Sequence, residues 1–151
     1  MTNIIDLFTI GFAGKSAERF FTLLMENGVR LVIDIRLHNT SQLAGFAKKD
    51  DLRYFLKVIG GIDYLHLPIL APTEEILTAY KKNKGDWSVY ERDFLSLIAR
   101  RGIEREATPA LLHRGCLLCG EAKPHHCHRR LGAEYLREKW GNVVIHHLMN
   151  S

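Results

Sequence analysis

Residues 29–36 read VRLVIDIR, a short and mostly aliphatic run that ends in two charged side chains, Asp34 and Arg36. Valine, leucine and isoleucine at this density are typical of a strand that is buried on both faces, as in a parallel sheet. Residues two apart on a strand point to the same face, so either one charge orients the other or both bind a substrate. This stretch therefore predicts a central strand whose carboxyl end carries polar groups.

Four other segments have the same apolar character, at residues 4–10, 62–67, 116–119 and 143–145. Stretches with helical spacing and capping residues lie between the strands, and they begin near Ser16, Asp50, Thr73, Glu91, Thr108 and Pro124. In the second of these helices the side chains expected to face inward are Leu52, Phe55, Leu56 and Ile59. Because strands alternate with helices, the sequence predicts a Rossmann-like α/β fold with a mostly parallel central sheet flanked by helices, in one domain over residues 1–151.

The composition is that of a globular domain, with 151 residues of which 46% are hydrophobic and 25% charged. No run approaches the roughly 18–20 apolar residues that span a bilayer, and the first residues lack the basic start and cleavage site of a signal peptide. Three cysteines without a secretory signal predict free thiols in a reducing compartment. We therefore expect a cytoplasmic protein with no membrane partner.

The net charge is +4, which permits an anionic partner without requiring one. The chain has no lysine-rich arm and no basic run interleaved with aromatic residues, so a nucleic-acid partner is not favoured and a small anionic ligand is expected instead. Six of the eight histidines lie between His113 and His147, in the stretch that also holds all three cysteines. This stretch is where we expect the chemistry, although the sequence indicates neither a cofactor nor an oligomeric state.

The predicted carboxyl ends of the strands are polar, although the strand interiors are apolar. In chain order these ends carry Gly11, Asp34 with Arg36, His66, Cys119 with Glu121, and His146 with His147. Ligands of open parallel sheets bind outside these ends. The sequence therefore predicts one site at this edge, with substrate-binding roles for Gly11, Asp34, Arg36 and His66.

At these residues the sequence resembles the family called domain of unknown function 488 (DUF488). The matching segments run in order over nearly the whole chain: Thr9-Ile10-Gly11-Phe12, Gly14-Lys15-Ser16, Val32 to Arg36, Ser41 with Phe46, and Tyr64-x-His66-x-Pro68-x-Leu70. The most specific match is Cys116-x-x-Cys119-x-Glu121, followed by Cys127-His128-Arg129-Arg130. The resemblance implies a compact α/β fold and a cysteine-centred site, and it supplies no settled activity.

Cys127 is the first candidate nucleophile. If Pro124 lies in the first turn, Cys127 sits in the opening turns of a helix, where free N–H groups and the helix dipole favour a thiolate. Arg129 and Arg130 add positive charge and suit a phosphate or carboxylate, so we expect both to bind substrate. The alternative is a half-buried cysteine beside two surface arginines.

Cys119 is the second candidate nucleophile, at a strand end that faces the same helix. Glu121 or His128 is then the candidate proton carrier, which completes the proposed catalytic set of Cys119, Glu121, Cys127 and His128. For Glu121 a purely structural alternative remains open, namely an ion pair with Arg129 or Arg36.

A metal site is another interpretation of the same cluster. Cys119 and Cys127 could ligate zinc or iron together with one of His125, His126 or His128. Cys116 lies three residues from Cys119, which in a strand places it on the opposite face, so we expect it in the core. A third interpretation is a disulfide or redox pair of Cys119 with Cys127, which needs Cα atoms within about 7 Å.

Residues 9–16 have the strand–loop–helix setting of a phosphate-binding loop and end in Gly14-Lys15-Ser16. Such a loop needs glycine at the position of Thr9, so we expect a tight turn with Lys15 on the surface instead.

Two classes of function follow. The first is a thiol-dependent enzyme that acts on a small anionic, phosphate- or nucleotide-like substrate. The second is a non-catalytic module that binds a metal or another ligand, and a nucleic-acid-binding protein ranks third.

Overall fold

A computed structural model describes residues 3–39, 45–82, 84–121, 124 and 126–149 of the chain, so Ser41 lies outside the described residues. Within them the strands are β1 (Ile5–Gly11), β2 (Leu31–Asp34), β3 (Asp63–His66), β4 (Gly115–Cys119) and β5 (Val143–Leu148). The helices are α1 (Ala17–Glu26), α2 (Lys49–Gly60), α3 (Glu74–Lys82), α4 (Trp87–Arg101), α5 (Ile103–Glu106), α6 (Pro109–Leu112) and α7 (His128–Trp140), with 3-10 turns η1 (Gly45–Ala47) and η2 (Pro68–Leu70). None of these described helices combines the length and the apolar character that crossing a membrane requires.

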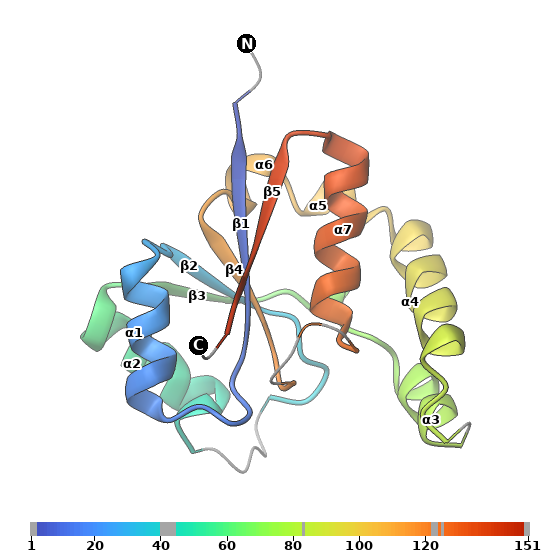
Figure 1. Cartoon of the computed structure of the whole chain (residues 1–151), viewed down its shortest axis with the longest axis horizontal. Helices are drawn as coiled ribbons and strands as arrows, with labels where there is room; N and C mark the ends of the chain where they lie inside the picture. Colours follow the sequence, from blue (N-terminus) through green and yellow to red (C-terminus); the bar gives the residue numbers. More distant parts are fainter. Residues whose placement is uncertain (1–2, 40–44, 83, 122–123, 125, 150–151) are drawn as a thin grey trace.

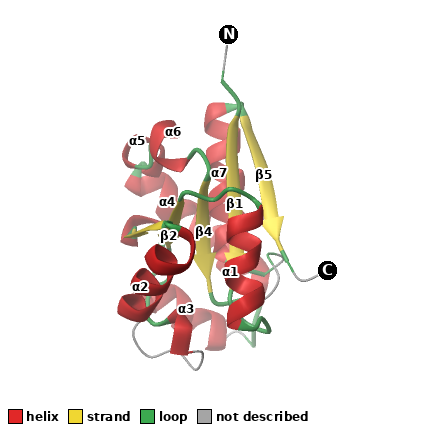
Figure 2. Ribbon diagram, turned by 90° about the vertical axis from the view of Figure 1, so that its left-hand side faces the viewer, coloured by secondary structure: helices red, strands yellow, loops and turns green. Residues whose placement is uncertain are grey.

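The strands form one sheet in the order β3-β2-β4-β1-β5, and every neighbouring pair is parallel. The predicted Rossmann-like α/β fold is therefore confirmed, and the sheet is parallel throughout rather than mostly. Figure 1 shows the twist of the sheet, because β2 and β3 run roughly horizontally in this view while β1 and β5 run from top to bottom. In Figure 2 the arrows of β1, β4 and β5 point the same way, so their carboxyl ends meet at one edge.

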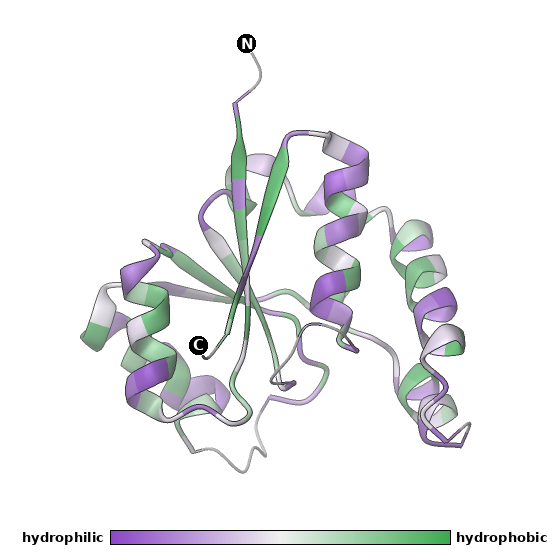
Figure 3. Cartoon of the chain, in the orientation of Figure 1, coloured by the Kyte–Doolittle hydropathy of each residue, from purple (hydrophilic) through white to green (hydrophobic). Residues whose placement is uncertain are grey.

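Helices cover both faces of the sheet and bury two separate apolar clusters. On one face, α1 and α2 pack Phe20, Leu24 and Leu56 against strand residues such as Val32 and Leu118. On the other face, Phe94 of α4 and Leu136 of α7 pack against the strand residues that alternate with these, which include Leu7, Ile33 and Leu117. Figure 3 shows both hydropathic colours on α1 and α7, as expected of helices with one buried face. The strand alternation therefore decides which side chains face α7.

The order of the strands creates a switch point at the exits of β1 and β4. The chain leaves β1 through α1 on one face, and it leaves the neighbouring β4 toward α7 on the other face. In open parallel sheets such a divergence opens a crevice outside the strand ends, where ligands bind. The register pairs Gly11 with Cys119 there.

Several predicted boundaries are wrong. The last long helix begins at His128 and not at Pro124, because Cys127 is extended (φ −142°, ψ 139°) and serves as the N-cap while its sulfur is held at the end of β4. Helix α4 begins a turn before Glu91, because the Asp86 side chain accepts a hydrogen bond from the Ser88 N–H and caps it there. Ile59 is 46% exposed instead of inward, because it borders an open groove between α1 and α2.

The layered packing makes a first prediction about stability. Phe20 is fully buried between α1 and the sheet, so Phe20→Ala should lower the free energy of unfolding by about 3–5 kcal/mol. Tyr54, which is 62% exposed on α2, provides an aromatic control, and Tyr54→Ala should cost only about 0.5 kcal/mol. Urea unfolding of the three proteins measures the difference, and equal losses in the two variants would contradict the packing described above.

Candidate functional site

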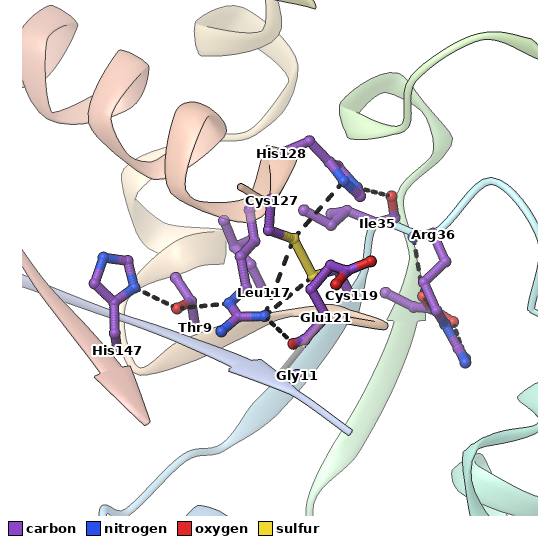
Figure 4. The surroundings of a disulfide bond; sticks show 12 residues. Thr9, Gly11, Ile35, Arg36, Leu117, Cys119, Glu121, Cys127, His128 and His147 are labelled. Carbon is purple, nitrogen blue, oxygen red and sulfur yellow. Dashed lines mark hydrogen bonds and ion pairs between the residues drawn. A yellow bond between two sulfur atoms is a disulfide. The ribbon is translucent and has the colours of Figure 1, made fainter. Parts of the chain in front are cut away.

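The centre of the site is a disulfide between Cys119 and Cys127 at the switch point. Cys119 follows Leu117 by two residues on β4, so strand alternation turns its side chain toward α7, whose N-cap is Cys127. The two sulfurs are bonded and the Cα atoms are 7.5 Å apart, slightly more than the roughly 7 Å expected from the sequence. Figure 4 shows this bond with His128 on one side and Thr9 and His147 on the other. Of the three interpretations of the cysteines, the structure contains the disulfide.

Arg129 lies beneath this pair with no exposed surface. Its Nη1 donates to Cys119 Sγ at 3.1 Å and to the backbone carbonyl of Glu121 at 2.6 Å, and its Nε donates to Thr9 Oγ1 at 3.2 Å. Burial lowers the pKa of Arg129 to about 10, which still leaves the guanidinium charged at neutral pH. A positive charge is therefore held in contact with a sulfur atom of the pair.

The guanidinium reaches this place because residue 11 is glycine. A Cβ at Gly11 would lie 1.4 Å from the Glu121 carbonyl oxygen and 2.5 Å from Arg129 Nη1. Only a residue without a side chain lets the Glu121 carbonyl and the guanidinium approach β1 this closely. The missing side chain of Gly11 therefore makes room for the Glu121 carbonyl and the Arg129 guanidinium.

His128 borders the other side of the disulfide. Its Nε2 is 2.7 Å from the Ile35 carbonyl oxygen, which can only accept, so Nε2 carries the proton and Nδ1 has a lone pair. Nδ1 lies 4.0 Å from Cys127 Sγ. Burial, with a smaller contribution from Arg129, lowers the pKa of His128 to about 4, although its hydrogen bond to Ile35 acts in the opposite direction. The ring is therefore neutral at pH 7, and it places no second charge beside the Cys127 sulfur.

Asp34 and Arg36 form a buried pair at the end of β2. Arg36 donates from Nε and Nη2 to the two carboxylate oxygens of Asp34, at 2.8 Å each, and Tyr64 donates to the same carboxylate at 2.5 Å. Burial alone would raise the pKa of Asp34, but the bonds from Arg36 and Tyr64 outweigh it, so the pKa is lowered. Asp34 is thus saturated and orients Arg36, whose Nη1 is buried without a hydrogen-bond partner in the described part of the chain.

A cavity of about 410 Å³ opens above the disulfide. The predicted residues that line it are Arg36, Cys119, Glu121, Cys127 and His128. The rest of its wall is largely aromatic and apolar. It comes from the loop after β2, from α3 and α4, and from the segments just before α3 and α7, with Leu37, Pro72, Leu77, Tyr80, Trp87, Tyr90 and His126 among its members. The volume is in the range of small-molecule sites.

The chain matches the family described as domain of unknown function DUF488 over residues 16–136, which is most of its length. The chain belongs to the DUF488 family. No curated protein and no solved structure matches it. The predicted family is therefore confirmed, and for this DUF488 protein any activity has to be argued from the site.

Two predicted residues of this DUF488 protein point elsewhere. Arg130 makes an ion pair within α7 with Glu134 at 3.1 Å and another across to Glu91 of α4 at 3.8 Å. It does not line the cavity, because successive helical residues diverge by about 100°. His66 Nε2 lies 3.1 Å from the Arg36 carbonyl oxygen and steadies that loop from outside the cavity.

Glu121 lies at the mouth of the cavity and is exposed. The contact described for Arg129 at this residue is with the backbone carbonyl, and Arg36 takes Asp34 as its carboxylate partner instead of Glu121. The side chain of Glu121 is therefore on the cavity side of the site, as a proton carrier would need to be.

Two features of the site were missed or misjudged from the sequence. Lys15 is 8% exposed and donates to the Gly11 carbonyl at 2.8 Å, so the prediction of a surface lysine is wrong. Its pKa is lowered by burial and by the nearby Arg129. The aromatic residues Trp87 and Tyr90 were also missed, although their spacing of three residues at the start of α4 is a helical signal.

The described residues give no support to the metal interpretation. Among the described residues there is no cluster of three or more His, Cys, Asp or Glu side chains that could hold an ion, and His125 lies outside them. Cys116 is a fully buried free thiol in the core, as predicted, and burial raises its pKa.

The close approach at Gly11 predicts a severe effect of a single methyl group. Gly11→Ala should lower the free energy of unfolding by about 3 kcal/mol or more, because the Cβ meets a backbone carbonyl that cannot move aside cheaply. Gly45→Ala is the control, since a Cβ there has no atom within 4 Å. Chemical denaturation measures both, and a Gly11→Ala protein as stable as Gly45→Ala would contradict this geometry.

The lowered pKa of His128 predicts that the stability of the fold depends on pH. The unfolded chain protonates this histidine near pH 6.5 and the folded chain only near pH 4, so its contribution is complete above pH 6.5 and is lost as the pH falls toward 4. The loss should amount to about 3 kcal/mol and should be absent in His128→Gln. Urea unfolding of both proteins between about pH 7.5 and pH 4.5 gives the difference between their free energies of unfolding. As the pH falls, the unmodified protein should lose stability relative to His128→Gln. A difference that stays constant would mean that His128 is not held neutral.

Proposed function

We propose that this protein is a thiol-dependent enzyme that acts on a small anionic substrate, with Cys119 and Cys127 as the reactive pair. One observation carries the proposal: the Cys119–Cys127 disulfide lines an open cavity while a buried guanidinium contacts Cys119 Sγ at 3.1 Å. A disulfide that served only to brace the fold would not need a cavity, a buried cation and a neutral histidine around it.

The surroundings favour a thiolate when the pair is reduced. The Arg129 charge beside Cys119 lowers the free energy of a sulfur anion relative to a thiol. Cys127 caps α7, so the N–H groups and dipole of a 13-residue helix act on its sulfur as well. Lys15, buried nearby, adds to the positive potential.

The chemistry that suits this pair is a two-electron reduction. The Cys119 thiolate attacks one sulfur of a substrate disulfide or one oxygen of a substrate peroxide, and the S–S or O–O bond breaks. The leaving group departs with the electron pair of that bond and takes up a proton. Cys127 then loses its proton to solvent, and its sulfur attacks Cys119 Sγ. The bond between Cys119 and the substrate breaks, the substrate atom leaves with that electron pair and takes up a proton, and the disulfide results. A small dithiol then reduces the disulfide for the next cycle.

The remaining cavity residues have matching roles in this scheme. Arg36 supplies a fixed positive charge at the cavity wall, which Asp34 and Tyr64 hold in place from behind. Glu121, exposed at the mouth, can pass protons between the cavity and solvent.

The proposal predicts that both cavity cysteines are needed for turnover and that the third is not. With dithiothreitol as reductant and an anionic aryl hydroperoxide such as the 4-carboxylate of cumene hydroperoxide as substrate, catalysed turnover should fall at least about 100-fold in Cys119→Ser and in Cys127→Ser. Cys116→Ser, which alters a buried core thiol, should keep most of the activity.

The double variant Cys119→Ser, Cys127→Ser decides the matter. Turnover by that protein at the rate of the unmodified protein would refute the proposal. So would a reduced protein whose Cys119 and Cys127 thiols react no faster near neutral pH than a small-molecule thiol.

A further inference from the structure

Two buried hydrogen-bond donors at the cavity wall have no partner. Among the described residues, Arg36 Nη1 and Trp87 Nε1 are the buried side-chain nitrogen atoms that no acceptor satisfies, and both residues line the cavity above the disulfide. A buried N–H group without an acceptor is costly, and native proteins leave few of them. Two on one cavity indicate that a ligand supplies the acceptors.

The two donors differ in chemistry. Arg36 is 5% exposed, and its Nε and Nη2 donate to Asp34, so Nη1 offers the two N–H groups that remain on that side of a charged guanidinium. Its guanidinium also lies over the Phe12 ring, with Cζ 5.6 Å from the ring centroid, which further fixes its orientation. Trp87 Nε1 offers a neutral N–H at the edge of an indole ring. An anionic group suits the first donor and an uncharged acceptor or a second oxygen suits the second.

The wall around Trp87 is a stack of rings. Trp87 stacks on Tyr90 with centroids 4.7 Å apart and on His126 with centroids 4.9 Å apart, and Tyr80 meets Trp87 edge-on at 6.0 Å. Leu77 and Pro72 complete this apolar side. An inorganic anion would leave such a surface uncovered, and it would fill only a small part of about 410 Å³.

We infer that the cavity is specific for an organic anion that carries an aromatic or heteroaromatic ring, with Arg36 and Trp87 as the specificity-determining residues. The anionic group accepts from Arg36 Nη1, and the ring lies against the wall of Tyr80, Trp87, Tyr90 and His126. This inference rests on the proposed function in placing a substrate at the cysteine pair, and it names the class of that substrate.

Three probes separate the contributions of ring and charge: phenylphosphonate, methylphosphonate and benzyl alcohol. By isothermal titration calorimetry of the oxidised protein, phenylphosphonate should bind at least about tenfold more tightly than either of the others, because methylphosphonate lacks the ring and benzyl alcohol lacks the charge. Equal affinities of phenylphosphonate and methylphosphonate would overturn the inference, as would equal affinities of phenylphosphonate and benzyl alcohol.

The two tryptophans of the chain provide a matched pair of variants. Trp87→Phe keeps a ring in the wall and removes only the N–H, and it should weaken phenylphosphonate about three- to tenfold. Trp140→Phe changes the far end of α7, roughly 20 Å along the helix from Cys127, and should leave binding unchanged. Equal effects of the two changes would overturn the role of Trp87. Arg36→Lys, which keeps a charge beside Asp34, should weaken phenylphosphonate and leave benzyl alcohol unaffected.

Binding and turnover are read separately, so the two proposals can fail separately. If phenylphosphonate binds selectively and the double cysteine variant still turns over, the thiol chemistry is wrong and the ligand class stands. If turnover depends on both cysteines while phenylphosphonate and methylphosphonate bind alike, the thiol chemistry stands and the ligand class is wrong.

Discussion

The rest of the site depends on the burial of one positive charge, the guanidinium of Arg129, where β1, β4 and α7 meet. Removing such a group from water costs several kcal/mol unless its N–H groups find acceptors. Thr9 Oγ1, the Glu121 carbonyl and the sulfur of Cys119 provide them. Thr9 is in turn 2.6 Å from Nδ1 of His147, so the network crosses from β4 through β1 to β5.

This one constraint accounts for several residues that otherwise look unrelated. Gly11 leaves the space through which the guanidinium and the Glu121 carbonyl approach β1. His147 has its pKa lowered by burial and by Arg129, which favours a neutral ring beside Thr9 Oγ1. Lys15 donates to the Gly11 carbonyl. The disulfide thus contacts a network of buried, hydrogen-bonded polar groups.

The cavity side of the disulfide is built on a second fixed charge. Arg36 is held by Asp34, which Tyr64 fixes in turn, and by the Phe12 ring, and these contacts leave its Nη1 without a partner in the described part of the chain. Arg129 contacts the Cys119 sulfur from below, while Arg36 lies in the cavity wall. One buried cation is therefore placed beside the cysteine pair, and the other beside the cavity.

The sequence by itself determined the sheet, its parallel direction and the edge that carries the site, because aliphatic runs, caps and polar strand ends are local patterns. It also determined the residue types of the cluster, from Cys119 to Arg129. It could not determine that Cys127 is an extended N-cap bonded to Cys119, nor that Lys15 is buried, since both follow from contacts between distant segments. The aromatic wall from α4 and the separation of Arg129 from Arg130 were likewise decided only by the tertiary structure. Packing of helices on the sheet fixes which of two adjacent side chains points inward, and the spacing of residues along the chain does not carry that information.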